Sequence, residues 1–131
     1  MKRTPYQPAG VFEPAGKAYS HGVIVEAGRT LYVAGQTARD AQGKIVGKGD
    51  AAAQTRQLLE NMKQVVEGAG GRMEDVAKTT VFLVDMGDFP VMNDVYAEAF
   101  AGHRPARSTV AVAALPLGAR VEVEVWAYVP R

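Results

Sequence analysis

Two segments with the pattern of amphipathic helices each lie between runs of β-forming residues, and this order restricts the possible folds more than any other feature. In residues 50–70, Asp50 is a candidate N-cap. In residues 88–102, Pro90 falls in the first turn, and Gly102 ends the segment. Apolar residues recur at helical spacing in both, namely Leu58, Met62, Val65 and Val66, then Met92, Val95, Tyr96 and Ala99. We therefore predict two helices that connect strands.

The β-forming runs predict a mixed sheet that contains two hairpins. Two runs within residues 18–37 flank the sequence EAGR, whose glycine favours a hairpin turn. A further strand is predicted at 75–85. Two more runs, 106–115 and 119–129, flank PLGA, which predicts a second turn. Residues 44–46 are a candidate for a short extended piece between these elements.

The whole chain is predicted to be one domain of the α+β class. Its 131 residues are enough for one hydrophobic core and too few for two ordinary ones. Residues 1–17 contain several prolines and are expected to form an irregular lead-in. Because right-handed crossovers place successive helices on the same face of a sheet, we expect two helices on one face and none on the other. An uncovered apolar face favours a homo-oligomer, and sites between subunits become plausible.

Composition excludes several classes of function. There are 15 Lys and Arg against 14 Asp and Glu, which gives no reason to expect nucleic acid or an anionic membrane as a partner. The absence of cysteine rules out disulfides and thiol nucleophiles, and two distant histidines, His21 and His103, do not indicate a metal site. We expect no metal and no cofactor. The N-terminus lacks the apolar core of a secretory signal, and no run is long enough to cross a bilayer, so a cytoplasmic location is the default expectation.

Charged residues at the C-terminal strands are the candidates for chemistry. In RVEVEVWA, Val121, Val123 and Val125 alternate with Glu122 and Glu124, so the glutamates share one face. Arg107 stands at the start of the preceding run. If the two runs pair as a hairpin, Arg107 and one glutamate can approach each other. The sequence does not separate a cross-strand ion pair, worth about 0.2–1 kcal/mol, from an anion site beside a carboxylate.

Several motifs together resemble the RidA/YjgF family of reactive intermediate deaminases, also known as L-PSP endoribonucleases. They are VAGQT, QTRQLLENMKQVVEGAG, DVAKTTVFLVDMGDFPVMNDVYAEAF, RPARSTVAVAALP and VEVEVWA, in this order. The resemblance extends from Tyr19 to Val129. It implies a single RidA-like domain over residues 1–131, with the chorismate-mutase-like fold, and a homotrimer with three sites between subunits.

The resemblance also implies which residues form the site. Arg107 matches the substrate-binding arginine of the PARS motif, and Glu122 matches the carboxylate that positions water. These two are the expected catalytic residues. Four further positions match residues expected to contact substrate together with Arg107: Tyr19, Gly35, Asn93 and Thr109.

Three departures from the family pattern concern the site, and two of them, Arg104 and a short segment at 101–104, lie near its expected rim. Thr109 occupies a position where many members have cysteine, and Arg104 a position where an apolar or aromatic residue is common. Together with a short segment at 101–104, Arg104 puts the identity of the substrate in question more than the reaction. His21, His103 and Trp126 receive no role from the pattern.

The implied activity is hydrolysis of enamines and imines derived from amino acids, such as 2-aminoacrylate, to a 2-oxo acid and ammonia. Arg107 would hold the substrate carboxylate with its planar fork, and Glu122 would position the water. Three alternatives remain open: a non-catalytic module that binds small carboxylates, an endoribonuclease, and a deaminase of larger or aromatic intermediates. A panel of imines derived from several amino acids would distinguish the deaminases, and the small net charge argues against RNA.

Overall fold

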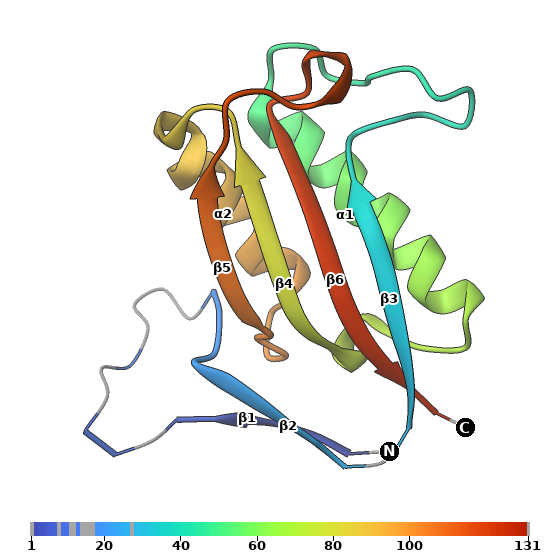
Figure 1. Cartoon of the computed structure of the whole chain (residues 1–131), viewed down its shortest axis with the longest axis vertical. Coiled ribbons are helices and arrows are strands. Elements are labelled where there is room, and N and C mark those ends of the chain that lie inside the picture. The colour runs from blue at the N-terminus through green and yellow to red at the C-terminus, as the bar shows by residue number, and fades with distance from the viewer. Residues whose placement is uncertain (1, 8, 11–12, 14–17, 27, 131) are drawn as a thin grey trace.

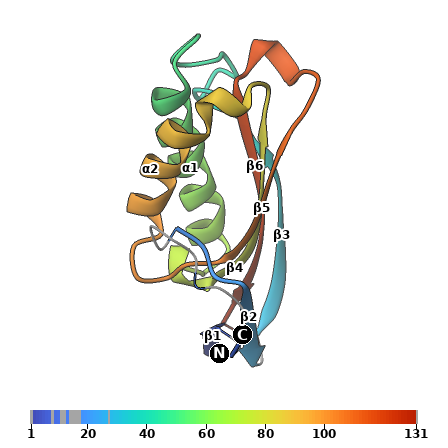
Figure 2. The ribbon, with the colours of Figure 1, turned by 90° about the vertical axis from the view of Figure 1, so that its left-hand side faces the viewer.

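The computed structural model describes residues 2–7, 9–10, 13, 18–26 and 28–130. Two helices lie side by side on one face of a four-stranded sheet, and a separate two-stranded sheet lies at one end of it (Figures 1 and 2). The side view shows α1 and α2 on the same side of the sheet, with the other side uncovered by helices (Figure 2). The α+β prediction, with a mixed sheet and both helices on one face, is therefore confirmed.

The main sheet has the strand order β3-β6-β4-β5, formed by Arg29–Gln36, Val121–Val129, Val76–Leu83 and Ala106–Ala111. Strand β6 is antiparallel to both β3 and β4, whereas β4 and β5 are parallel. The hairpin predicted between residues 106–115 and 119–129 is therefore wrong, because β4 lies between β5 and β6. The sequence between β5 and β6 contains a short 3-10 turn, Pro116–Gly118, rather than a tight hairpin loop.

The N-terminal region also differs from the expectation. Residues 2–6 are not irregular: β1, Lys2–Tyr6, pairs antiparallel with β2, Gly22–Glu26. Strand β2 does not pair with β3, so the hairpin expected around EAGR is absent. The rest of the predicted lead-in lies largely outside the described residues, which include 7, 9–10 and 13. Of the expected extended piece 44–46, only a single bridge between Arg39 and Ile45 forms.

Both predicted helices are present and begin where the caps indicated. Helix α1 spans Ala51–Gly68, and the Ala53 amide donates to Asp50 Oδ1 at 3.0 Å. Helix α2 spans Phe89–Ala99 with Pro90 in its first turn. Gly70 and Gly102 follow the two helices with φ of +89° and +78°, a left-handed conformation that glycine adopts without a Cβ penalty. The predicted stripes are buried except for Val65 and Ala99, which are exposed.

The hydrophobic core lies between the two helices and the inner face of the sheet. The alternation predicted for the last strand is confirmed, since Val121, Val123 and Val125 are fully buried. The helices contribute fully buried side chains that pack on these valines: Leu58, Met62, Val66, Met92 and Tyr96. Burying apolar area in this way is the main favourable term in the stability of the sheet and the helices.

The face of the sheet away from the helices carries large side chains that remain accessible. Tyr32 is 70% exposed and Trp126 46% exposed, and their rings meet edge to face with centroids 5.5 Å apart. Val110 of β5 is 42% exposed on the same face. This is the uncovered apolar surface that the element order predicted, and surfaces of this kind commonly bind another protein chain.

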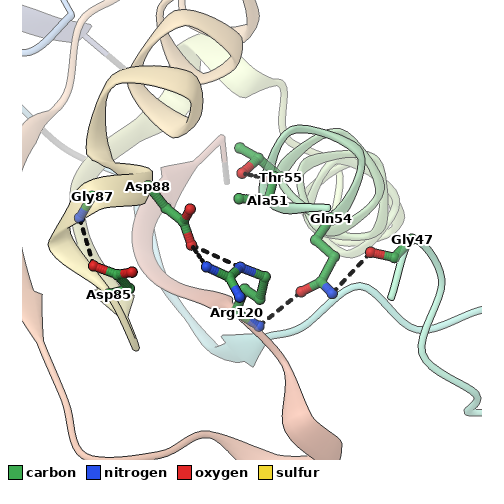
Figure 3. A network of polar contacts seen from close by, with 8 residues as sticks. All are labelled: Gly47, Ala51, Gln54, Thr55, Asp85, Gly87, Asp88 and Arg120. Carbon is green, nitrogen blue, oxygen red and sulfur yellow. Dashed lines mark hydrogen bonds and ion pairs between the residues drawn. The ribbon is translucent and has the colours of Figure 1, made fainter. Parts of the chain in front are cut away.

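A buried polar network joins both helices to the start of β6 (Figure 3). The fully buried Gln54 accepts a hydrogen bond from the Arg120 amide at 2.9 Å and donates one to the Gly47 carbonyl at 3.1 Å. The Arg120 guanidinium forms an ion pair with Asp88, just before α2, with the Nη2 and Oδ2 atoms 2.7 Å apart. These bonds fix the position at which β6 begins relative to both helices.

Replacing Gln54 with methionine should destabilise the protein by about 1–3 kcal/mol, because the Arg120 amide and the Gly47 carbonyl lose their buried partner. Urea unfolding measures the free energy of unfolding. Gln64→Met on the exposed face of α1 is the matched control, with an expected change within about 0.5 kcal/mol. Equal effects of the two substitutions would contradict this account of the network.

Candidate functional site

Arg107 lies on the edge strand β5 with its side chain toward α2. It pairs with Thr79 of β4, whose side chain is fully buried on the helix side of the sheet. Paired residues of neighbouring strands point to the same face, so Arg107 extends over that side as well. There its Nη1 donates to Asn93 Oδ1 at 2.7 Å. The strand and the helix thus hold two of the predicted site residues in contact.

Three aromatic rings surround the Arg107 guanidinium. Its Cζ lies 4.8 Å from the Tyr96 ring centroid, 5.1 Å from that of Tyr19 and 5.4 Å from that of Phe89. Ring faces attract a cation but do not neutralise it. Burial lowers the pKa of Arg107 from its usual value, and the nearby Tyr96 and Tyr19 hydroxyls oppose this shift. The groups around Arg107 therefore replace only part of the water that would otherwise solvate its charge.

No carboxylate of the described residues offsets this charge. The ion pairs within this part of the chain involve Arg72 and Arg120 as the cations, and none involves Arg107. Tyr96 does not supply an anion, because burial raises the pKa of its phenol, whose oxygen lies 2.7 Å from Thr79 Oγ1. A partly desolvated guanidinium with free donors and no counter-charge is suited to hold an anion.

Glu122 lies on the opposite face of the sheet. It pairs with Phe82, whose neighbours Val81 and Leu83 point into the core, so Phe82 and Glu122 face away from the helices. The expected approach of Arg107 to a glutamate across a hairpin is therefore wrong for a single chain. The reason is topological, since β4 separates the two strands and the two side chains leave the sheet on different faces.

Gly35 is the predicted site residue that lies beside Glu122. A Cβ at this position would clash with the Glu122 carboxylate and stand 2.7 Å from its Cδ. The backbone of β3 is irregular here, because its register with β6 shifts between Val33 and Gln36. The glycine therefore leaves room for the carboxylate against the strand. Five of the six predicted residues form two groups: Arg107, Asn93 and Tyr19 in contact on one face, and Glu122 with Gly35 on the other.

Thr109 follows Arg107 on the same side of β5. It pairs with the fully buried Val81, and its hydroxyl oxygen is buried without a hydrogen-bond partner. Buried polar atoms in native proteins are nearly always paired, so an unpaired one indicates a missing partner. The sequence reasoning did not identify the rings of Phe89 and Tyr96 as part of this group. In the sequence, Tyr96 belongs to the apolar stripe of a helix. The signal that could have pointed to the site is its position three residues after Asn93, which places both residues on the same face of the helix.

Two larger hollows lie away from Arg107. One, of about 640 Å³, is a groove between α1 and α2 with charges of both signs around Leu59 and Val95. The other, of about 600 Å³, borders Trp126 and Lys78 between β2 and the open face of the sheet. Neither is lined by a predicted site residue. A small cavity of about 190 Å³ adjoins Tyr19.

Comparison with known proteins assigns the chain to a family. Residues 12–129 match the family model described as Endoribonuclease L-PSP. The chain belongs to the Rid family, also called YjgF. A RutC family protein of Pyrococcus horikoshii is 47% identical over 104 residues, which cover 79% of this chain and 82% of that protein. A rat protein named 2-iminobutanoate/2-iminopropanoate deaminase is 41% identical over 107 residues, 82% of this chain and 77% of that one.

Solved structures agree with this assignment. A protein of the conserved Rid family from Yersinia pestis has a TM-score of 0.91 at 32% identity, covering 98% of this chain and all of that one. RidA from an Antarctic Psychrobacter has a TM-score of 0.73 at 35% identity, covering 96% and 94% of the two chains. The predicted family and fold of this Rid protein are thus confirmed. Relatives that are named as deaminases support Rid-type deaminase activity.

The described portion of this Rid protein contains no group of three or more His, Asp or Glu side chains placed to bind a metal ion. A search of the same portion finds no helix long and apolar enough to span a bilayer.

Gly35→Ala should destabilise the protein by about 1–3 kcal/mol, because the added methyl group collides with the Glu122 carboxylate. Urea unfolding provides the measurement, and Gly68→Ala, where the same methyl group meets open space, is the control. Combining Gly35→Ala with Glu122→Ala removes the clashing atoms, so the double variant should be more stable than additivity predicts. Simple additivity would show that the close approach does not exist.

Proposed function

We propose that this Rid protein is a hydrolytic deaminase of reactive enamine and imine intermediates derived from amino acids, such as 2-aminoacrylate. It converts the imine and water to a 2-oxo acid and ammonia. The observation that carries the proposal is the Arg107 guanidinium, which is held by Asn93 and three rings and has no carboxylate partner among the described residues. Its free donors bind the substrate carboxylate as a planar fork.

The proposed site is completed by a second copy of the chain. Glu122 and Gly35 lie on the face that the helices leave uncovered, where Tyr32 and Trp126 are also exposed. Seating this face against the β5 edge of a neighbouring copy in a homotrimer buries apolar area and brings Glu122 of one copy toward Arg107 of another. The backbone amides of Gly35 and Thr109 then help to hold the substrate carboxylate. Tyr19 and Asn93 shape the pocket and orient the nitrogen.

The reaction requires little beyond positioning. An enamine first tautomerises to the imine, whose carbon is electrophilic. Water adds to this carbon while Glu122 accepts one of its protons, and that proton is returned to the nitrogen. The hydroxyl proton of the resulting carbinolamine passes to its amino nitrogen as the C–N bond breaks and the C=O bond forms, and ammonia leaves. No electron is transferred to or from the protein. Correct placement of water and substrate can lower the barrier by about 7–11 kcal/mol in the best cases.

Arg107→Lys tests whether the planar pair of donors on Arg107 is needed to bind the substrate carboxylate. Lysine keeps the charge but loses two parallel donors, so we expect kcat/KM for 2-iminobutanoate to fall about 100-fold or more. The imine is generated by an amino-acid oxidase, and the loss of imine is followed as release of free ammonia. Thermal unfolding of the variant shows whether the fold persists. Unchanged turnover in a folded variant removes Arg107 from the mechanism.

Glu122→Gln tests the carboxylate. Glutamine keeps the size of the side chain but accepts no proton, so kcat should fall by about 100-fold or more while the affinity for 2-oxobutanoate changes little. Equal losses of turnover and affinity would instead make Glu122 a group that organises the binding site. If the unmodified protein binds 2-oxobutanoate but hydrolyses no imine, the chain is a carboxylate-binding module. If it cleaves RNA and leaves imines unchanged, the ribonuclease alternative holds.

A further inference from the structure

Arg104 differs from the other partly buried arginines in having a buried side-chain nitrogen without a hydrogen-bond partner. Its Nη1 atom is buried and has no hydrogen-bond acceptor, and Arg104 takes part in none of the ion pairs within the described portion of the chain. By contrast, Arg120 is paired with Asp88, Arg107 with Asn93, and Arg3 donates to backbone carbonyls. A buried N–H donor that is left unpaired is costly, so its retention requires an explanation.

A cavity of about 190 Å³ lies against Arg104. Its other lining residues are Pro5, Tyr6, Gln7, Glu13, Tyr19 and Ser20. The Ser20 hydroxyl donates to the Arg104 carbonyl at 2.5 Å, and the Ser20 amide donates to the Pro105 carbonyl at 2.9 Å. These two bonds join the backbone before β2 to the start of β5. They therefore fix the position of Tyr19 relative to Arg104.

Tyr19 connects this cavity with the candidate site. Its ring lies 5.1 Å from the Arg107 guanidinium, and the same residue lines the cavity beside Arg104. Arg107 and Arg104 thus adjoin one aromatic side chain. A ligand whose carboxylate is held by Arg107 and whose chain passes Tyr19 would bring its far end toward Arg104.

We propose that the cavity beside Arg104 holds a second carboxylate, so that the preferred substrates are imines derived from acidic amino acids. The inference rests on the proposed function, because it takes Arg107 to hold the first carboxylate. A guanidinium offers a planar set of donors that matches a carboxylate, and two further lining residues, Tyr6 and Tyr19, carry neutral hydroxyl donors. Arg104 is therefore a specificity-determining residue and takes no part in the bond changes.

Among the described residues that line the cavity, Glu13 is the acidic one. It is exposed and forms no ion pair with Arg104. Glu13 therefore does not occupy the place of an anion on Arg104, but its negative charge opposes one that enters the cavity. Replacing Glu13 with glutamine should accordingly strengthen the binding of a dicarboxylate, whereas weaker binding would contradict the assignment.

The test compares two stable 2-oxo acids of equal chain length, 2-oxoglutarate and 2-oxopentanoate, by calorimetric titration of the unmodified protein. We expect 2-oxoglutarate to bind about tenfold or more tightly. Arg104→Met keeps much of the side-chain length but removes the charge. It should abolish this preference while leaving the affinity for 2-oxopentanoate unchanged. Arg56→Met on the exposed face of α1 changes the net charge equally and should keep the preference.

Binding of the two acids with equal affinity, or a preference that persists in a folded Arg104→Met variant, overturns the proposal. The result is independent of the proposed chemistry, since binding of stable acids needs no turnover. Hydrolysis of 2-iminobutanoate by a protein that shows no preference for the dicarboxylate would sustain the deaminase and refute the role of Arg104. Loss of binding of both acids in Arg107→Met would show that both occupy the expected site, and retained binding of either would place it elsewhere and contradict the assignment.

Discussion

The parallel pairing of β4 with β5 is the constraint on which the candidate site depends. A parallel pair requires a crossover connection, and α2 supplies it by packing across the face on which Arg107 lies. The crossover brings Asn93 and Tyr96 against the guanidinium and removes part of its water. Because β5 lies at the edge of the four-stranded sheet and β4 separates it from β6, no glutamate of β6 can reach Arg107 within the chain. The cation is held firmly and left without a counter-charge.

The same arrangement accounts for the surface on the other face. Both helices cover one side of the sheet, so Glu122 and the large side chains of β3 and β6 remain on the uncovered side. In an isolated chain this surface favours association with other protein chains, because its aromatic rings are exposed to water. In the proposed homotrimer it becomes the interface and supplies the carboxylate that the Arg107 side lacks. Oligomerisation and catalysis then depend on the same face.

Arg107 and Arg104, two arginines near the start of β5, differ in their burial and in their hydrogen-bond partners, and we assign them different roles on that basis. Arg107 has an amide partner and a surround of rings, which orient it, whereas the buried Nη1 of Arg104 has no acceptor beside a small cavity. In the proposed scheme the first holds the group common to all substrates, and the second discriminates among them. The reaction itself is then insensitive to Arg104, whereas the choice of substrate depends on it.

The sequence by itself determined both helices, the alternation in β6 and the uncovered face, because these follow from local periodicity, from caps such as Asp50 and from the order of elements. Family motifs also identified the chain as a Rid protein and pointed to Arg107. Tertiary structure alone decided which strands are neighbours. In place of the two expected hairpins, the structure has β1 paired with β2 and β4 paired with β5. It also has Arg107 and Glu122 on opposite faces of the sheet. The physical reason is that strand pairing depends on long-range packing between segments far apart in the chain, whereas a turn sequence reports only local backbone preference.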